Sequence, residues 1–185
     1  MIIIEGPDNS GKSTLAQALK EQSLINEVWH AGGPGFNPER LRDELWRVAT
    51  NLTVAHDRAN FISGPIYERA FNNAQLNYDI NLCKANVEYM LKHKLVFIIY
   101  CKGHGPFTAR EAESEEYNNK VKAVDSQLRF AYNDFFENLL RRYDNCVSYD
   151  FNHGESELAK VLEKLRSFQT ELFSLRQEFQ ETSYE

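Results

Sequence analysis

A phosphate-binding loop is predicted close to the start of the chain. Residues 6 to 13 have the spacing Gly-x-x-x-x-Gly-Lys-Ser, and the apolar run at residues 2–4 lies just before them. The two glycines allow the backbone to wrap around phosphate oxygens, Lys12 brings a positive charge, and the Ser13 hydroxyl suits Mg²⁺. The helix predicted next adds its N-terminal amides and dipole. The residues expected to hold a nucleoside triphosphate are Asn9, Ser10, Gly11, Lys12, Ser13 and Thr14.

Asp57 and Arg58 form a second candidate site. They follow the short apolar run that begins at Leu52, so we expect them at the carboxyl end of a strand. An aspartate beside a phosphate loop can support Mg²⁺ through water, and an arginine can bind a phosphate with two hydrogen bonds. The alternative is a local ion pair, with Asp57 capping the following helix.

These residues need a scaffold in which strands alternate with helices. Apolar runs predict strands at residues 1–5, 27–31, 52–56, 95–101 and 146–151. Helical patterns occupy residues 12–22, 38–50, 66–92 with a break around 77–81, 121–142 and about 155–182. The alternation predicts right-handed βαβ units, and hence a three-layer α/β/α fold with a five-stranded parallel sheet. Ligands of such sheets bind beyond the carboxyl ends of the strands.

The segment from about residue 102 to 122 is a candidate lid. It has no apolar period, is rich in Gly, Glu and Asn, and contains one arginine, Arg110. Its position after the fourth strand places it above the site as a loop or helical hairpin. A solvated surface loop is the alternative.

Composition favours one domain and a small-molecule partner. The 185 residues fit a single domain. The net charge of −6 provides no overall positive field, which makes a nucleic-acid partner unlikely. The three cysteines form no Cys-x-x-Cys pair and indicate buried thiols of a reducing cytosol rather than a zinc site or disulfide framework. Without a signal-like or membrane-length apolar run, we expect a cytoplasmic protein.

The two candidate sites resemble those of thymidylate kinases. Residues 5–14, Glu-Gly-Pro-Asp-Asn-Ser-Gly-Lys-Ser-Thr, are similar to the phosphate loop of that family, which typically carries an acidic residue at the position of Asp8. Asp57-Arg58 with Ser63 and Tyr67 is similar to its Asp-Arg, Ser, Tyr signature, although the last two fall one residue later than usual. The resemblance covers roughly the first 75 residues and the remainder only by layout. The chain looks like a diverged small kinase of this group, such as bacteriophages encode for unusual deoxynucleotides.

The resemblance implies a P-loop NTPase fold and phosphoryl transfer from ATP, with Mg²⁺, to a (deoxy)nucleoside monophosphate, which becomes the diphosphate. Lys12 and the amides of residues 9–14 would hold ATP, Ser13 would bind Mg²⁺, and Asp57 would support the metal from outside its ligand shell. Such a transfer depends on positioning and on cations more than on covalent chemistry.

On the acceptor side, the resemblance implies that Arg58 binds the acceptor phosphate. Asp8 would face the acceptor sugar or order Arg58, and Arg110 would close over the transferred phosphoryl group. Further candidates are Gln127 and Arg129, on the helix after the lid, for which an exposed helix face is the alternative. The aromatic residues that could stack on an acceptor base, or pack in the core instead, are Phe61, Tyr67 and Phe71.

Two other classes of function stay open on the sequence. The acceptor could be a nucleoside or a polynucleotide 5′ end, or the protein could be a nucleotide-dependent switch or binding module. At the other end of the chain, an apolar stripe recurs at steps of three and four. It consists of Leu158, Val161, Leu165, Phe168, Leu172, Leu175 and Phe179. The stripe predicts packing on the sheet for its first half and a homodimer contact at residues 167–182.

Overall fold

A five-stranded parallel sheet forms the middle layer of the protein. The computed structural model describes residues 1–30, 52–71, 79–103 and 114–182, with side chains up to residue 175. The strands are β1 (Ile2–Glu5), β2 (Glu27–His30), β3 (Val54–Asp57), β4 (Phe97–Lys102) and β5 (Cys146–Asp150). They are all parallel and lie in the order β2-β3-β1-β4-β5. The predicted sheet is therefore confirmed.

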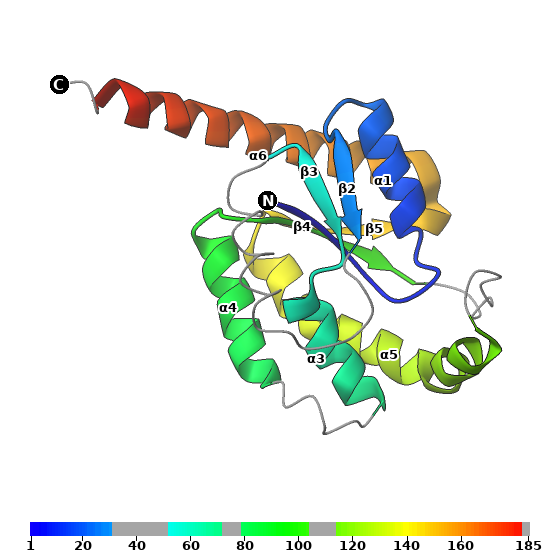
Figure 1. Cartoon of the computed structure of the whole chain (residues 1–185). Helices are drawn as coiled ribbons and strands as arrows, with labels where there is room; N and C mark the ends of the chain where they lie inside the picture. The colour runs from blue at the N-terminus through cyan, green and yellow to red at the C-terminus, as the bar shows by residue number, and fades with distance from the viewer. Residues whose placement is uncertain (31–51, 72–78, 104–113, 183–185) are drawn as a thin grey trace.

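Helices cover both faces of the sheet (Figure 1). One face carries α1 (Lys12–Glu21) and α6 (Gly154–Thr182), which a short 3-10 helix, η2 (Phe151–His153), precedes. The other face carries α3 (Asn60–Phe71), α4 (Ile80–Lys92) and α5 (Glu115–Arg142). The three-layer α/β/α architecture predicted from the alternation is thus confirmed.

The central strand β1 is buried on both faces. Ile3 packs into the core beneath α3, α4 and α5, whereas Ile2 and Ile4 pack beneath α1 and α6, and all three side chains are fully buried. This explains the continuous apolar run, because a strand covered on both faces has no solvent-facing alternation. β1 pairs with β3 so that Ile4 lies opposite Asp57. The chain therefore leaves both strands at the same edge of the sheet.

Several predicted boundaries were wrong. α3 begins at Asn60, six residues before the predicted start at 66, and its first two turns are almost entirely buried. α5 begins at Glu115 rather than 121, because the Ser114 side chain accepts a hydrogen bond from the Tyr117 amide and two glutamates occupy the first turn. Caps and buried helix turns do not show in apolar periodicity.

The predicted lid, about residues 102–122, overlaps regular elements at both of its ends. Lys102 ends β4, and residues 115–122 are the first turns of α5, with Asn118 and Val121 buried. Its role as a lid stays a prediction. Residues 104–113, which include Arg110, lie outside the described residues. The helix predicted at 38–50 and part of the predicted break, residues 77 and 78, also lie outside them.

The final helix packs against the sheet with its first half. Val161, Leu165 and Phe168 are buried against β1, β4 and β5 residues, whereas Phe173 and Leu175 are exposed. Figure 1 shows α6 continuing beyond the sheet. The homodimer contact at residues 167–182 stays a prediction. No helix in the described part of the chain combines the length and apolarity needed to cross a membrane.

We expect the two halves of α6 to respond differently to truncation. Leu165→Ala should lower the free energy of unfolding by about 2–5 kcal/mol, because it leaves a cavity between α6 and the sheet. Phe173→Ala, on the exposed half, should change it by less than about 1 kcal/mol. Urea denaturation, at a protein concentration where gel filtration gives a monomer, measures both losses. Equal losses in the two variants would contradict this packing.

Candidate functional site

A cavity lies at the carboxyl-terminal edge of the sheet, beside the loop after β1, the ends of β2 and β3, and the residue that follows β5. It has a volume of about 540 Å³ and joins both predicted phosphate motifs. The residues that line it are Asn9, Ser10, Gly11, Lys12, Ser13, Thr14, His30, Asp57, Arg58 and Phe151. Eight of these ten residues, all except His30 and Phe151, were predicted site residues.

Close packing dictates the two glycines of the β1–α1 loop, residues 6–11. Gly6 has φ 149°, and a Cβ there would lie 2.8 Å from Ser10 Oγ and closer still to the Cys101 carbonyl. Gly11 has φ 79°, and its Cβ would lie 2.9 Å from Phe151 Cβ. Larger residues would therefore push the loop away from β4 and η2, so only glycine lets the chain turn here.

Lys12 folds back over this loop. Its Nζ donates hydrogen bonds to the carbonyls of Gly6 (3.0 Å) and Pro7 (2.6 Å), and more weakly to Ser10 Oγ (3.4 Å). Burial, helped by the nearby Arg58 charge, lowers the pKa of Lys12 to about 8. The group still carries most of its charge at neutral pH. These three acceptors are neutral oxygens, so they leave the positive charge of Lys12 available to an anion.

Asp8 connects the two motifs. One carboxylate oxygen accepts a hydrogen bond from Arg58 Nη2 at 2.7 Å, and the other accepts one from the Tyr67 hydroxyl at 2.9 Å. The Arg58 guanidinium also lies over the Tyr67 ring, 5.3 Å from its centroid. With only 1% of the Asp8 side chain exposed, water screens this ion pair little. Arg58 is thereby held at the cavity rim.

Asp57 and Ser13 have the chemistry of a magnesium site. Asp57 Oδ2 lies 3.0 Å from His30 Nδ1, whereas its Oδ1 is buried and has no hydrogen-bond partner in the described part of the chain. Ser13 is exposed on the same cavity. The described residues contain no cluster of three or more acidic, histidine or cysteine side chains that could hold a metal alone.

The other predicted substrate residues lie in different surroundings, in the core, at the site or on the surface. Phe61 is buried in the core and Phe71 packs against it, whereas Tyr67 reaches the site through Asp8. Gln127 is exposed and contacts its neighbour Ser126.

Arg129 lies beside the loop. Its guanidinium, tied to Asp125 at 2.8 Å, occupies the space beside Gly103 and Pro7. Its Nη1 is buried without a hydrogen-bond partner among the described residues. Of the two predicted α5 residues, Arg129 is therefore the one that α5 brings to the β1–α1 loop.

Sequence reasoning missed several residues at this edge of the sheet, among them His30, which ends β2 and lines the cavity beside Asp57. Phe151 is half exposed and forms a wall of the cavity beside Gly11. Glu5 is fully buried, where its carboxylate accepts hydrogen bonds from the Ala59 amide (2.6 Å) and the Tyr132 hydroxyl (3.2 Å). The signal for Glu5 was a lone carboxylate at the end of an apolar strand. Phe151 and Tyr132 carried none, because only the fold brings them here.

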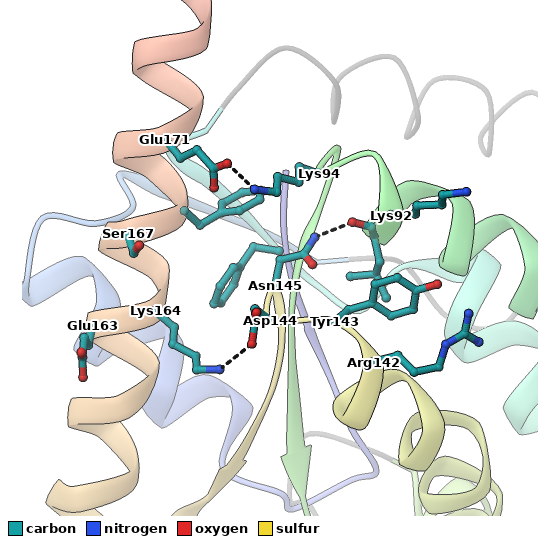
Figure 2. Close-up of a pocket in the computed structure, with 13 residues that line it drawn as sticks. Lys92, Lys94, Arg142, Tyr143, Asp144, Asn145, Glu163, Lys164, Ser167 and Glu171 are labelled. Atoms are coloured by element: carbon teal, nitrogen blue, oxygen red, sulfur yellow. Dashed lines mark hydrogen bonds and ion pairs between the residues drawn. The ribbon is translucent and has the colours of Figure 1, made fainter.

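A second cavity of about 530 Å³ opens at the opposite, amino-terminal edge of the sheet (Figure 2). Ion pairs link its wall on α6 to the rest of the protein: Lys94 with Glu171, and Lys164 with Asp144 at 3.5 Å. The Asn145 amide donates to the carbonyls of Leu91 and Val96. Lys94 and Lys164 in this cavity are therefore already neutralised by acidic side chains.

Comparisons with known proteins support the fold. No family model matches the sequence. A solved structure of the YorR protein from Bacillus subtilis, in complex with phosphorylated GDP, is similar over 97% of this chain and 97% of its own, with a TM-score of 0.59 and 19% identity. X-ray repair cross-complementing protein 6 of Mus musculus is 34% identical in an alignment of 98 positions that covers 49% of this chain. The match spans only 16% of that protein's length.

We expect Glu5 to make stability depend on pH. Burial raises the pKa of Glu5 from 4.5 to about 7, although the Ala59 hydrogen bond and the nearby Arg58 and Lys12 charges oppose this. Between these values the folded protein binds more protons than the unfolded chain, so stability falls as pH rises. Relative to Glu5→Gln, the wild type should lose about 3 kcal/mol between pH 4.5 and 7. Urea denaturation across this range measures the difference, and parallel curves would contradict it.

Proposed function

We propose that this protein is a thymidylate kinase-like enzyme that transfers the terminal phosphoryl group of ATP to a (deoxy)nucleoside monophosphate. The observation that carries the proposal is the 2.7 Å contact between Asp8, within the β1–α1 loop, and Arg58, after β3. It holds an arginine beside the loop that carries Lys12, at one cavity. A switch that only hydrolyses a nucleotide can also use an arginine, but it needs no site for an acceptor, which the substrate panel below tests.

The β1–α1 loop is the donor side of the proposed site. Lys12 would leave the Gly6 and Pro7 carbonyls and bind the β and γ phosphates of ATP, while the amides at the start of α1 face the same cavity. The Ser13 hydroxyl and the unpartnered Asp57 Oδ1 fit Mg²⁺, directly and through water respectively. Bound Mg²⁺ would neutralise charge on the phosphate oxygens.

Arg58 is the acceptor side of the proposed site. Asp8 holds one guanidinium nitrogen, while Nε is buried without a hydrogen-bond partner among the described residues, so donors are left for an acceptor phosphate. Arg129 supplies a further, partly buried cation beside the loop. Lys12 and Arg58 would then hold donor and acceptor phosphates close together. Such positioning accounts for most of the rate enhancement in phosphoryl transfer.

The bound nucleotide of YorR adds independent support. That protein, similar along nearly its whole length, holds a phosphorylated GDP. A nucleotide ligand is what the cavity at the β1–α1 loop suits in the present protein. The identity of its base and sugar is left to the assay below.

Lys12→Ala should nearly abolish turnover while the protein stays folded. Loss of a cation that contacts the transferred group removes transition-state stabilisation, and we expect kcat to fall about 100-fold or more. Lys20→Ala, at the exposed end of the same helix, is the matched control and should keep wild-type activity. A coupled assay of ADP formation measures both. Normal transfer by Lys12→Ala would refute the role of Lys12.

A substrate panel separates the proposed reaction from its rivals. The protein is incubated with ATP, Mg²⁺ and, in separate reactions, nucleosides, ribo- and deoxynucleoside monophosphates and an oligonucleotide with a 5′ hydroxyl. We expect diphosphates from one or more monophosphates. Products only from nucleosides or the oligonucleotide would change the acceptor class, and ATP hydrolysis that no acceptor stimulates would indicate a switch.

A further inference from the structure

Glu5 has contacts that the proposed mechanism does not use. Its side chain is completely buried at the end of β1, yet within the described part of the chain it forms no hydrogen bond with Lys12 or with the residues that line the cavity. Instead, one carboxylate oxygen accepts the Ala59 amide at 2.6 Å and the other accepts the Tyr132 hydroxyl at 3.2 Å. Glu5 therefore connects β1 to the β3–α3 turn and to α5.

The backbone that Glu5 holds is unusual. Arg58 has φ 68°, a left-handed conformation that costs free energy in a residue with a side chain. Two consecutive amides secure it, since Arg58 N donates to the Ile4 carbonyl at 2.9 Å and Ala59 N donates to Glu5. Such a conformation persists only where the surroundings impose it. One of the two acceptors is thus a main-chain carbonyl, that of Ile4, and the other is the side chain of Glu5.

The same contacts form a closed series that includes Arg58. Glu5 accepts a hydrogen bond from the Tyr132 hydroxyl, and the aromatic ring of Tyr132 packs edge to face against that of Tyr67, with the centroids 6.3 Å apart. Tyr67 then donates to Asp8, which holds Arg58. Arg58 is thus fixed twice, at its backbone by Glu5 and at its guanidinium by Asp8.

We propose that Glu5 is a positioning residue, which locks the Arg58–Ala59 peptide in its left-handed conformation and so aims the Arg58 guanidinium at the acceptor phosphate. Its effect on catalysis rests on the proposed function, whereas its effect on the Arg58 backbone does not. Glu5 positions this peptide through the side-chain oxygen that accepts the Ala59 hydrogen bond, and a negative charge on that side chain is not required.

The cost of burying this carboxyl group is consistent with such a role. An apolar side chain of similar size would fill the same space without desolvating a charge, whereas burial raises the pKa of Glu5 to about 7 even though its hydrogen bonds and the nearby cations oppose the shift. A hydrophobic residue could not, however, accept the Ala59 amide, which would then be a buried donor without a partner.

Three substitutions at this position test the proposal. Glu5→Gln keeps an oxygen for the Ala59 amide, Glu5→Met fills the volume without an acceptor, and Glu5→Asp keeps the charge but retracts it by one methylene. We expect Glu5→Met and Glu5→Asp to raise KM for the monophosphate about tenfold or more, with KM for ATP changed less than about twofold. Glu5→Gln should stay within about threefold of wild type for both substrates.

Asn145→Leu is the matched control for lost stability. Asn145 is also buried and donates two hydrogen bonds, to backbone carbonyls, but lies at the opposite edge of the sheet (Figure 2). It should lower the melting temperature without changing the ratio of the two KM values. The same ratio change in Asn145→Leu as in Glu5→Met would overturn the proposal, and so would a Glu5→Gln protein that is unfolded or defective toward the monophosphate.

Amide hydrogen exchange separates this proposal from the proposed function. The Ala59 amide should exchange slowly in the wild type and in Glu5→Gln, and at least tenfold faster in Glu5→Met or Glu5→Asp. This readout needs no turnover. If the wild type phosphorylates no monophosphate, the proposed function fails while exchange at Ala59 still tests the lock. Unchanged exchange in all three variants would overturn the positioning role even in an active enzyme.

Discussion

The parallel pairing of β1 with β3 is the constraint on which the rest of the site depends. With Ile4 opposite Asp57, the chain leaves both strands at the same level, and the Arg58 amide then bonds the Ile4 carbonyl. A shift of one residue would turn the side chains of β1 to the opposite faces of the sheet. Because Ile2, Ile3 and Ile4 are buried in two different cores, hydrophobic packing holds the register that the polar residues need.

The strands and the polar loops were predictable because they depend on local patterns. A doubly covered strand appears as a continuous apolar run, and Gly6, Gly11 and Lys12 stand at a spacing that few other structures require. Their neighbourhood with Asp57 and Arg58 followed from strand order alone, since parallel strands place their carboxyl ends together. The roles of these residues toward substrates and metal stay predictions.

What the sequence could not provide depends on contacts between distant segments. Tyr132 lies 127 residues from Glu5, and no local pattern marks either as a partner of the other. Phe61 and Tyr67 looked alike as aromatic candidates, and α3 buries both in the same core, but the Tyr67 hydroxyl also reaches Asp8. Helix periodicity identifies an apolar face, but tertiary packing decides which residues of that face lie near the cavity.

Gly103 has a consequence for how this protein can change over time. The Arg129 guanidinium and the Pro7 ring fill the space that a side chain at 103 would need. A larger residue at 103 would displace the guanidinium from its place beside the loop, a movement that the flexible Arg129 side chain permits. Position 103 can therefore decide whether a cation borders the loop, although it lies 26 positions from Arg129 and on the other side of a helix boundary.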